Sequence, residues 1–331
     1  MYRIDRCPCC RERLDESCPA LLAPFLAERV LGGSASACSL MTCPTCGLRC
    51  FDGRFDEMEM GRLYQGYREE DYYRVRHRWE PWYTSKVNAA LSQDPAEMAA
   101  RKTNVFRLIS RTLEGASPGR ILDFGGDQGQ FIPDEWEAER FVFEISGRAP
   151  LPGIQSIEKR SDLEGACFDL VMLCHVLEHL SDPAAQMGIL HSLIGPSGVL
   201  YVEVPLERPN LHWAGSWPWT RPGLHWLARH PWLLRLVDLY STVFRIRRGT
   251  IPLGGFLKAS EHINFFTVRS LDALMRRMGF QVLACEELAF QGAYCEAKVL
   301  GCVARRSSPS PQLGFMPGVH EACPGPPRHG L

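Results

Sequence analysis

Short apolar runs alternate with stretches of helical spacing over residues 120–305. A strand that is buried on both faces reads as a continuous apolar run, so this pattern predicts a mostly parallel sheet covered by helices on both sides. The predicted strands are residues 121–124, 141–144, 168–176, 198–204, 281–286 and 293–304. The alternation predicts an α/β fold of the doubly wound type.

Three predicted helices have clear boundary signals. Asp94 and Asp182 each precede a proline, which is the arrangement of an N-cap followed by a proline in the first helical turn. Thr267 is the expected cap of a later helix that ends at Gly279. The glycine-rich turn at residues 125–129 is also expected to lead into a helix.

Composition divides the chain into four regions, one of which carries an insertion. Residues 1–53 are cysteine-rich and are expected to be loop-like, and residues 54–115 form a polar and aromatic linker region that ends in a helix. Residues 116–305 carry the α/β pattern, interrupted by a tryptophan-rich insertion at 207–258. Residues 306–331 are rich in proline, glycine and serine without periodicity, which predicts a disordered tail.

The overall charge gives no reason to expect a nucleic-acid partner. The 37 lysines and arginines nearly balance 38 acidic residues, for a formal net charge of −1, whereas proteins that bind nucleic acid carry a basic surface. DNA is therefore not expected and RNA is disfavoured. The N-terminus has no secretory signal and no apolar run approaches the ~20 residues that span a bilayer, so a cytoplasmic location is expected.

Cysteines are concentrated near the N-terminus, where eight of the 14 fall within the first fifty residues. Cys7 and Cys10 form one pair separated by two residues, and Cys43 and Cys46 form another. Two such pairs supply the four thiolates of a closed tetrahedral zinc site, which stabilises a fold and leaves no position open for a substrate. We predict structural zinc here, with Cys9 as an alternative to Cys10 as the ligand.

A glycine-rich turn after the first predicted strand is the sharpest sign of a small-molecule site. The strand ends in Asp123, and Gly125, Gly126 and Gly129 follow; glycines permit positive φ and a close approach of ligand to backbone. The next strand ends in Glu144, where an acid can accept both hydroxyls of a ribose. Because the Gly-x-Gly-x-x-Gly spacing is absent, a nicotinamide cofactor is less favoured.

Two further segments carry a family resemblance. Residues 175–183 read His-Val-Leu-Glu-His-Leu-Ser-Asp-Pro, and residues 261–267 read Glu-His-Ile-Asn-Phe-Phe-Thr. In both segments the sequence resembles the class I S-adenosylmethionine-dependent methyltransferases, and the resemblance extends over about residues 95–305. It implies a Rossmann-like, seven-stranded, mostly parallel sheet with a reversed final strand, accompanied here by the small N-terminal zinc module.

The resemblance also implies which residues bind S-adenosylmethionine. Those expected to contact the cofactor are Asp123, Gly125, Gly126 and Gly129 for the methionine and ribose portion, Glu144 for the ribose, Asp162 for the adenine amine, and Cys174 and His175 beside the sulfonium. Glu158 and Glu164 compete with Asp162 for its role. The sequence departs from the family at Asp127, which stands where the family has its middle glycine.

Methyl transfer to a hydroxyl needs a base, and a histidine with a pKa of about 6.5 suits that task. Three histidines fall in the segments of resemblance: His262, His179 and His175. Each has Glu178 or Glu261 close in sequence to orient it. His262 is the first choice as base; the alternative for His175 and His179 is a structural role in the turn after the strand predicted at 168–176.

The insertion occupies the position that builds the lid over the acceptor in class I enzymes. Its tryptophans offer faces for apolar or sugar stacking. Within it, residues 224–248 are amphipathic with a basic end, as in helices that lie on a membrane surface, so peripheral membrane contact is one expectation. A packed helical cap with a solvated basic rim is the alternative.

These features together predict methyl transfer from S-adenosylmethionine to a small-molecule acceptor, at oxygen or carbon. The acceptor classes are a sugar, a glycolipid precursor or another biosynthetic metabolite. Similar zinc modules also occur in methyltransferases that act on ribosomal RNA, so an RNA methyltransferase is one alternative. A non-catalytic scaffold that keeps the fold is the other.

Overall fold

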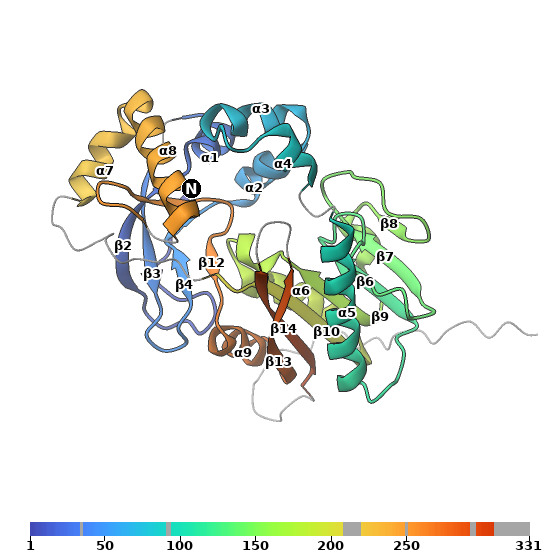
Figure 1. The fold of residues 1–331 in the computed structure, drawn as a ribbon. Helices are drawn as coiled ribbons and strands as arrows, with labels where there is room; N and C mark the ends of the chain where they lie inside the picture. The colour runs from blue at the N-terminus through green and yellow to red at the C-terminus, as the bar shows by residue number, and fades with distance from the viewer. Residues whose placement is uncertain (34–35, 91–93, 208–219, 249–250, 292–295, 308–331) are drawn as a thin grey trace, which may run out of the picture.

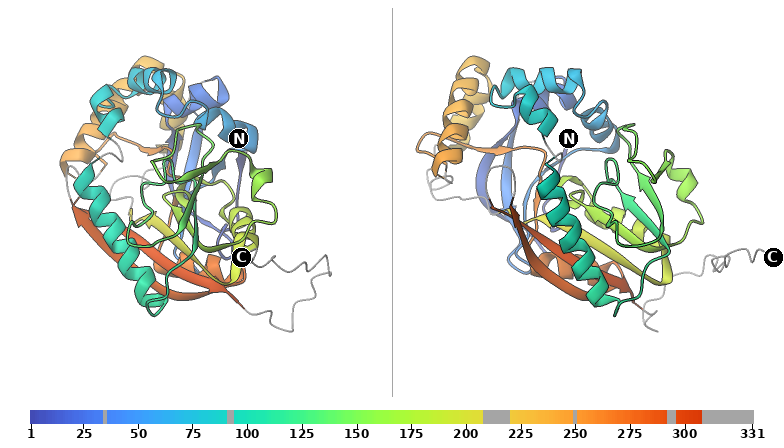
Figure 2. Two further views of the ribbon diagram at one scale, coloured as in Figure 1. Left: turned by 90° about the vertical axis from the view of Figure 1, so that its right-hand side faces the viewer. Right: turned by 45° about the vertical axis from the view of Figure 1, so that its right-hand side comes forward.

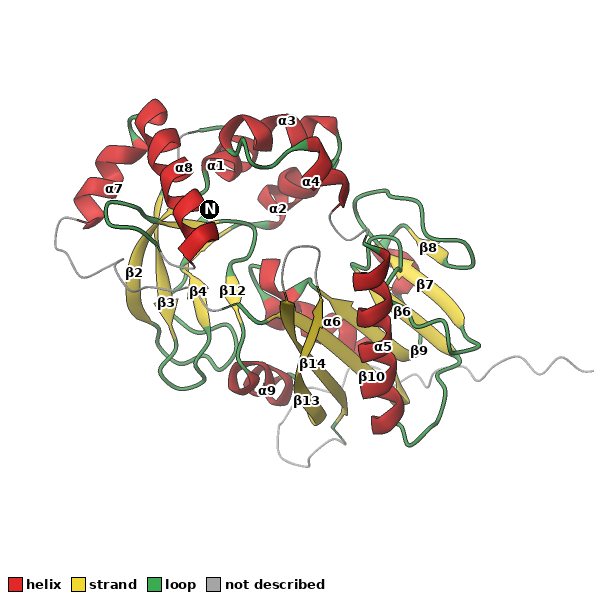
Figure 3. Ribbon diagram, in the orientation of Figure 1, coloured by secondary structure: helices red, strands yellow, loops and turns green. Residues whose placement is uncertain are grey.

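Two β-sheets lie side by side with helices around them (Figure 1), and the two kinds of element are distinguished in Figure 3. The computed structural model describes residues 1–33, 36–90, 94–207, 220–248, 251–291 and 296–307. The predicted tail, residues 306–331, lies outside the described residues from residue 308 onward. Within the described residues, no helix is long and apolar enough to cross a membrane.

The larger sheet has seven strands in the order β13-β14-β10-β9-β6-β7-β8. Its strands are β6 (Arg120–Phe124), β7 (Glu139–Phe143), β8 (Gln155–Ile157), β9 (Phe168–Cys174), β10 (Ile194–Pro205), β13 (Phe280–Gln291) and β14 (Glu296–Arg306). β14 is antiparallel to both neighbours, and the pairs from β8 to β10 are parallel. The predicted doubly wound, mostly parallel seven-stranded sheet with a reversed last strand is confirmed.

Helices cover both faces of this sheet because its central strands bury apolar side chains on both sides. In β9, Leu170 and Met172 pack on one face, and Val171 and Leu173 pack on the other. α5 (Pro95–Thr112) lies along the first face, as Figure 2 shows, and α6 (Pro183–Leu193) and α9 (Val268–Arg277) lie on the second. The predicted caps are confirmed: the side chains of Asp94, Asp182 and Thr267 each accept a backbone N–H of their helix.

The helix expected after the glycine-rich turn is absent, and this prediction is wrong. Residues 125–138 form successive turns, in which the N–H of Gly129 donates to the carbonyl of Gly126 at 2.8 Å. Pro133 lies inside the segment and has no N–H to donate to a helix. The segment therefore connects β6 to β7 without regular structure, and the turn itself is held by other contacts.

The smaller sheet shows that the N-terminal region is not loop-like, which corrects a second expectation. Its order is β11-β2-β3-β4-β12, with β2 (Asp15–Leu22), β3 (Ala37–Thr42), β4 (Arg49–Phe51), β11 (Leu257–Ala259) and β12 (Asn264–Phe265). β1 (Tyr2–Arg3) pairs separately with β5 (Gly53–Arg54). Alternating apolar side chains make the strands: Ala20 and Leu22 are buried on one face and Leu21 on the other. The two edge strands come from residues far outside 1–53.

Helices also cover both faces of the smaller sheet. α1 (Pro24–Leu31), α2 (Glu57–Tyr64), α3 (Glu70–Trp79) and α4 (Ser85–Ala90) follow one another on the side of Ala20. On the side of Leu21 lie α7 (Thr220–Ala228) and α8 (Pro231–Arg248), which belong to the insertion. The described part of the predicted lid thus packs on the N-terminal sheet, and Trp213, Trp217 and Trp219 lie outside the described residues.

Candidate active site

The glycine-rich turn lies at the carboxyl end of β6, where doubly wound folds bind their ligands. Gly125 and Gly129 have φ values of +71° and +77°, which other residues rarely adopt. A Cβ on Gly126 would lie 2.1 Å from Cγ of Asp123, so the turn passes directly over that carboxylate. The turn requires glycine at these three predicted positions.

Asp123 is a fully buried acid at the end of β6. Its side chain is fully buried, and neither carboxylate oxygen has a hydrogen-bond partner among the described residues. Burial, with a contribution from the charge of Glu144, raises the pKa of Asp123 to about 7. An unpaired buried carboxylate is costly, so this position fits a ligand that brings a hydrogen-bond donor or a positive charge.

Glu144 stands just beyond β7 and holds the turn from the other side. Its Oε2 accepts the N–H of Asp127 at 3.1 Å, and its Oε1 accepts the N–H of Ser146 at 2.8 Å. An ionised carboxylate offers about four lone pairs, so capacity remains for the hydroxyls of a ribose. Asp127 has a φ of +56°, a conformation that aspartate tolerates better than most residues, and it pairs with Arg148 at 2.6 Å.

The other predicted cofactor residues differ in their surroundings. Cys174 is the last residue of β9, and burial, with the neighbouring charge of Asp123, raises the pKa of its thiol. Asp162 is exposed in a short 3-10 helix, Arg160–Leu163, which follows β8. Glu158 directly follows β8, and Glu164 directly follows the 3-10 helix. All three acids therefore lie on the connection that leaves the edge of the sheet.

His175 belongs to a buried polar network behind the site. Its Nε2 lies 3.2 Å from Oε1 of Glu203 on β10, and its Nδ1 lies 3.4 Å from Oε1 of Glu178. Glu203 also bonds to Arg101 of α5 and accepts the hydroxyl of Tyr201 at 2.8 Å. Although burial opposes the charged imidazole, Glu178 and Glu203 raise the pKa of His175. The network fixes the turn after β9.

His179 and His262 face each other at the same edge of the sheet. The N–H of Ile263 donates to the carbonyl of Glu178 at 2.8 Å, which joins the two segments, and the imidazole centroids are 4.7 Å apart. His262 Nδ1 lies 3.0 Å from Oε1 of Glu207. His179 Nδ1 lies 3.1 Å from the carbonyl of Glu261, which assigns its proton to Nδ1 and leaves Nε2 as an acceptor.

The two imidazoles have opposite pKa shifts. Burial and the charge of His262 lower the pKa of His179. Burial also opposes protonation of His262, but its bond to Glu207 raises its pKa to about 9. One ligand atom from each of Glu178, His179 and His262 lies within 4.8 Å of the others, a spacing that a cation can bridge. At neutral pH these shifts correspond to a neutral His179 beside a protonated His262.

Tyr64 of α2 packs against His179, and residues of α3 bond to Glu261. The ring of Tyr64 meets His179 edge to face at 6.1 Å, and its hydroxyl is buried without a hydrogen-bond partner among the described residues. Glu261 accepts the hydroxyl of Tyr72 and the guanidinium of Arg76, the latter at 2.9 Å. Burial, with a smaller contribution from the charge of Glu261, raises the pKa of Tyr64.

Sequence reasoning missed several of these residues. The missed side chains are Tyr64, Tyr72, Arg76, Arg101, Glu203 and Glu207. Two of them had a local signal: Arg101 occupies the apolar face of its helix, four residues before Val105, and Glu203 interrupts an apolar strand. A charge in such a position needs a buried partner. The residues of α2 and α3 had no signal, because their contacts depend on the tertiary fold.

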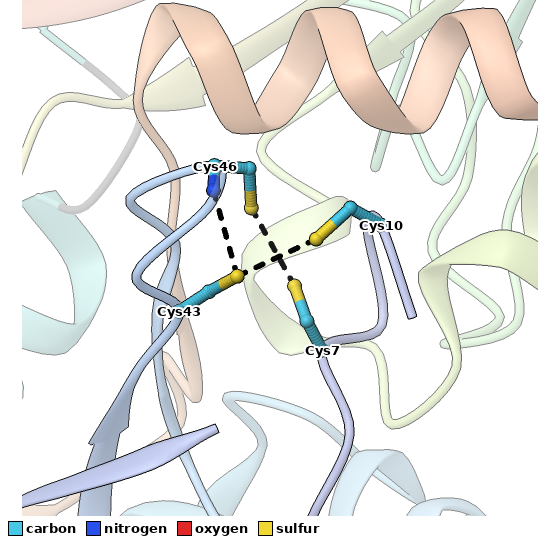
Figure 4. Close-up of side chains that lie close together, drawn as sticks. All are labelled: Cys7, Cys10, Cys43 and Cys46. Carbon is cyan, nitrogen blue, oxygen red and sulfur yellow. Dashed lines mark hydrogen bonds between the residues drawn. The ribbon is translucent and has the colours of Figure 1, made fainter. Parts of the chain in front are cut away.

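The four predicted zinc ligands come together, as Figure 4 shows. Cys7 Sγ is 3.5 Å from Cys46 Sγ, and Cys10 Sγ is 3.4 Å from Cys43 Sγ. Four sulfurs around one zinc ion at about 2.3 Å would be about 3.8 Å apart, so the cluster fits this metal. Cys9 is buried in the adjoining core and is not among the four.

The cysteine cluster rests on the larger sheet through α9. The hydroxyl of Thr267 donates to the carbonyl of Cys46 at 3.1 Å, and Arg269 donates to the carbonyl of Thr45 at 2.6 Å. Arg277, at the other end of the helix, donates to the carbonyl of Pro8 at 2.6 Å. Both cysteine pairs are therefore tied to the helix that follows the segment of His262.

The fold and the site agree with a family match. Residues 98–284, more than half of the chain, match the model of a family described as a methyltransferase domain. The chain belongs to this family. With its seven-stranded sheet, it is an S-adenosylmethionine-dependent methyltransferase of the class I fold. No curated protein matches the sequence of the methyltransferase.

Solved structures of other methyltransferases are distantly similar to this methyltransferase. One is the 1,6-didemethyltoxoflavin-N1-methyltransferase of Burkholderia thailandensis, with 13% identity, a TM-score of 0.43, and coverage of 82% of this chain and 96% of that chain. The CurJ carbon methyltransferase has 17% identity and a TM-score of 0.39, covering 70% of this chain and 61% of that chain. An Anabaena variabilis methyltransferase has 13% identity and a TM-score of 0.40, covering 69% and 95%.

Proposed function

We propose that this methyltransferase transfers the methyl group of S-adenosylmethionine to a small biosynthetic metabolite, such as a sugar or a glycolipid precursor. The methyl acceptor is an oxygen or a carbon that must lose a proton. The observation that carries the proposal is the pairing of His179 and His262, whose ring centroids are 4.7 Å apart, at the edge of the sheet that also bears the glycine-rich turn. Such a pair suits removal of a proton from a small molecule.

The cofactor is assigned to the turn between β6 and β7. Asp123 would take the ammonium group or a bridging donor, because its buried oxygens have no hydrogen-bond partner in the part of the chain that the structure describes. Glu144 would accept the ribose hydroxyls with its remaining lone pairs. Cys174 would line the sulfonium end, and Asp162, Glu158 or Glu164 would meet the adenine amine. S-adenosylmethionine supplies an activated methyl group on a sulfonium, and the protein supplies alignment and a dry environment.

His179 is the proposed general base. Its lowered pKa keeps the imidazole neutral near pH 7, and the carbonyl of Glu261 holds the proton on Nδ1, so Nε2 can take the proton of the acceptor. Glu178 lies 3.9 Å from Nε2, and its negative charge would stabilise the imidazolium that forms. Burial opposes the ionisation of Glu178, but the neighbouring histidines lower its pKa to about 2.

The other two histidines have different roles in this proposal. His262 is the first choice from sequence, but a pKa of about 9 leaves it protonated at neutral pH. As an imidazolium it would donate to the acceptor oxygen and stabilise negative charge there. His175 contacts Glu203 and Glu178 instead of open space, so it positions the turn after β9.

Zinc is assigned to the cluster of Cys7, Cys10, Cys43 and Cys46. Four thiolates close the coordination shell, so the ion would have a structural role. Its contribution would be to hold both cysteine pairs against α9, and with them the segment of Glu261 and His262. This assignment selects Cys10 over Cys9.

The proposal is tested with labelled cofactor and fractionated cell extract. Wild-type protein, His179→Ala and the control His191→Gln, which replaces a histidine packed on Phe280, receive methyl-labelled S-adenosylmethionine. We expect wild type and the control to label a small metabolite, and His179→Ala to label it far more slowly. Label in an RNA fraction would contradict a small-molecule acceptor. A melting temperature that does not change when S-adenosylmethionine is added would contradict the assignment of the protein as an enzyme that uses this cofactor.

A further inference from the structure

α8 presents a stripe of large apolar side chains to solvent. The exposed residues of the stripe are Trp232, Leu236, Leu239, Tyr240 and Val243, of which Trp232 is 67% and Leu236 is 56% exposed. Their spacing of three and four residues places them on one side of the helix. Two neighbours extend the surface: Trp226 of α7 is 54% exposed, and Leu253 accepts the hydroxyl of Tyr240 through its carbonyl at 3.5 Å. We call these seven residues the α8 surface.

The orientation of α8 is fixed by contacts on its opposite side. Asp238 is buried and pairs with Lys258 at 3.1 Å, and Lys258 pairs with Glu80 at 2.6 Å. Leu234 packs in the small core between α7, α8 and the N-terminal sheet. A helix held by a buried ion triad cannot rotate its apolar stripe inward without breaking those pairs. The stripe therefore faces solvent as a fixed feature of the fold.

The same segment is strongly basic. Residues 220–248 contain six arginines and a single acid, Asp238, which is buried against Lys258. Arg229 and Arg235 are exposed, and Arg235 is next to Leu236 of the stripe. Although Arg221 pairs with Glu16, Arg229 and Arg235 place positive charge beside the apolar surface of a chain whose formal net charge is only −1. Lone apolar residues on a surface are ordinary, but an apolar stripe with a basic border points to a partner.

We infer that the α8 surface binds a lipid bilayer that carries anionic headgroups. Tryptophan and tyrosine prefer the level of the headgroups, aliphatic side chains enter the acyl boundary, and arginines bind the negative surface. These are the three kinds of side chain that the segment exposes. Within the described residues, the helix is too polar to span the bilayer, so it would lie in the plane of the interface.

The inference is tested with the purified full-length protein and lipid vesicles. One set of vesicles is phosphatidylcholine alone, and the other contains phosphatidylglycerol as well. We expect co-sedimentation with the anionic vesicles, weak binding to the neutral ones, and release at high salt because the charges are exposed. Equal binding to both vesicles, or no binding to either, would overturn the inference. The vesicle measurements require neither cofactor nor acceptor, so their outcome does not depend on the proposed function.

Two pairs of variants separate the apolar and the charged contributions. Trp232→Gln with Leu236→Gln should lower vesicle binding more than about tenfold, whereas Met58→Gln, an equally exposed apolar residue on α2, should not. Arg229→Glu with Arg235→Glu should do the same, and Arg107→Glu on α5 should not. Unchanged melting temperatures show that the variants fold.

A second copy of the chain is the competing occupant of the α8 surface. Sedimentation velocity over a range of protein concentrations distinguishes the two. A monomer that binds anionic vesicles supports the inference. A dimer that disappears in the Trp232→Gln, Leu236→Gln variant would overturn it, because the stripe would then be an interface between copies.

Discussion

The rings of His179 and His262 meet edge to face, with centroids 4.7 Å apart and planes at 76°. The two residues are more than eighty positions apart in the sequence, and different neighbouring groups determine their protonation. Glu207 keeps His262 charged, and that charge in turn helps keep His179 neutral. The pKa of His179 thus depends on the charge of His262, and a separate prediction follows for each residue.

Replacing His179 should remove the base without removing the binding of cofactor. We expect His179→Gln to lower kcat by about 10²–10⁴-fold, while the cofactor Kd and the melting temperature stay close to wild type. His262→Gln should raise KM for the acceptor as well, because it loses a charged donor. Steady-state kinetics with titration calorimetry give both quantities, and an equal loss of kcat and of cofactor affinity in His179→Gln would contradict the assignment.

The pH profile of kcat/KM should be bell-shaped. His179 must be neutral to act, so activity is lost as pH falls through its pKa, which lies below the usual value of about 6.5. His262 must be charged, so activity is also lost as pH rises through about 9. Glu207→Gln removes the main partner that raises the pKa of His262, and it should move the alkaline limb to lower pH. An unmoved limb would show that another group titrates there.

Replacing Glu144 should weaken cofactor binding, and replacing Glu139 of β7 should not. Glu144→Gln keeps the shape but weakens hydrogen bonds worth about 1.5–3 kcal/mol when one partner is charged. We expect a rise of roughly tenfold or more in the Kd for S-adenosylmethionine. The matched control is Glu139→Gln, an exposed acid at the start of β7 that pairs with Arg120. Calorimetry on both variants would refute the assignment if their Kd values changed equally.

The cysteine cluster predicts different outcomes for adjacent residues. Cys10→Ser should lower bound zinc below one ion per chain and lower the melting temperature, because it removes one of the four thiolates. Cys9→Ser should keep one zinc ion and lose only some packing in the core. Metal analysis of the purified variants measures both. Full zinc in Cys10→Ser together with its loss in Cys9→Ser would reverse the ligand assignment.

Most strands of the larger sheet can be predicted from the sequence, because each is marked by a short apolar run or by a nearby capping residue. Apolar strands such as 168–174 and capping residues such as Asp94 act within a few positions of themselves, and both were found. The short edge strand β8, with exposed Gln155 and Ser156, lacks an apolar run and was missed. A helix is expected after Gly129 because a strand and a helix usually alternate in this fold. It does not form, because Pro133 and the tertiary contacts of the turn oppose it.

Only some residues of the candidate site can be predicted from the sequence. Asp123, Glu144 and the histidines could be proposed from their positions beside strand ends. The partners that set the charge of the histidines could not, because Glu207 and Tyr72 approach from remote segments. The ranking of His262 over His179 as base followed from position alone, and the pKa directions, which depend on those partners, favour the reverse.

The smaller sheet receives both of its outer strands from residues 257–265, long after β2, β3 and β4 have been made. During synthesis, the first three strands would therefore stand with two open edges, and open edges pair readily with other chains. A metal ion bound early by the paired cysteines would hold this intermediate together until the late strands arrive. Cells starved of zinc should then accumulate aggregated nascent protein, although β11 and β12 cover the edges of β2 and β4 in the folded enzyme.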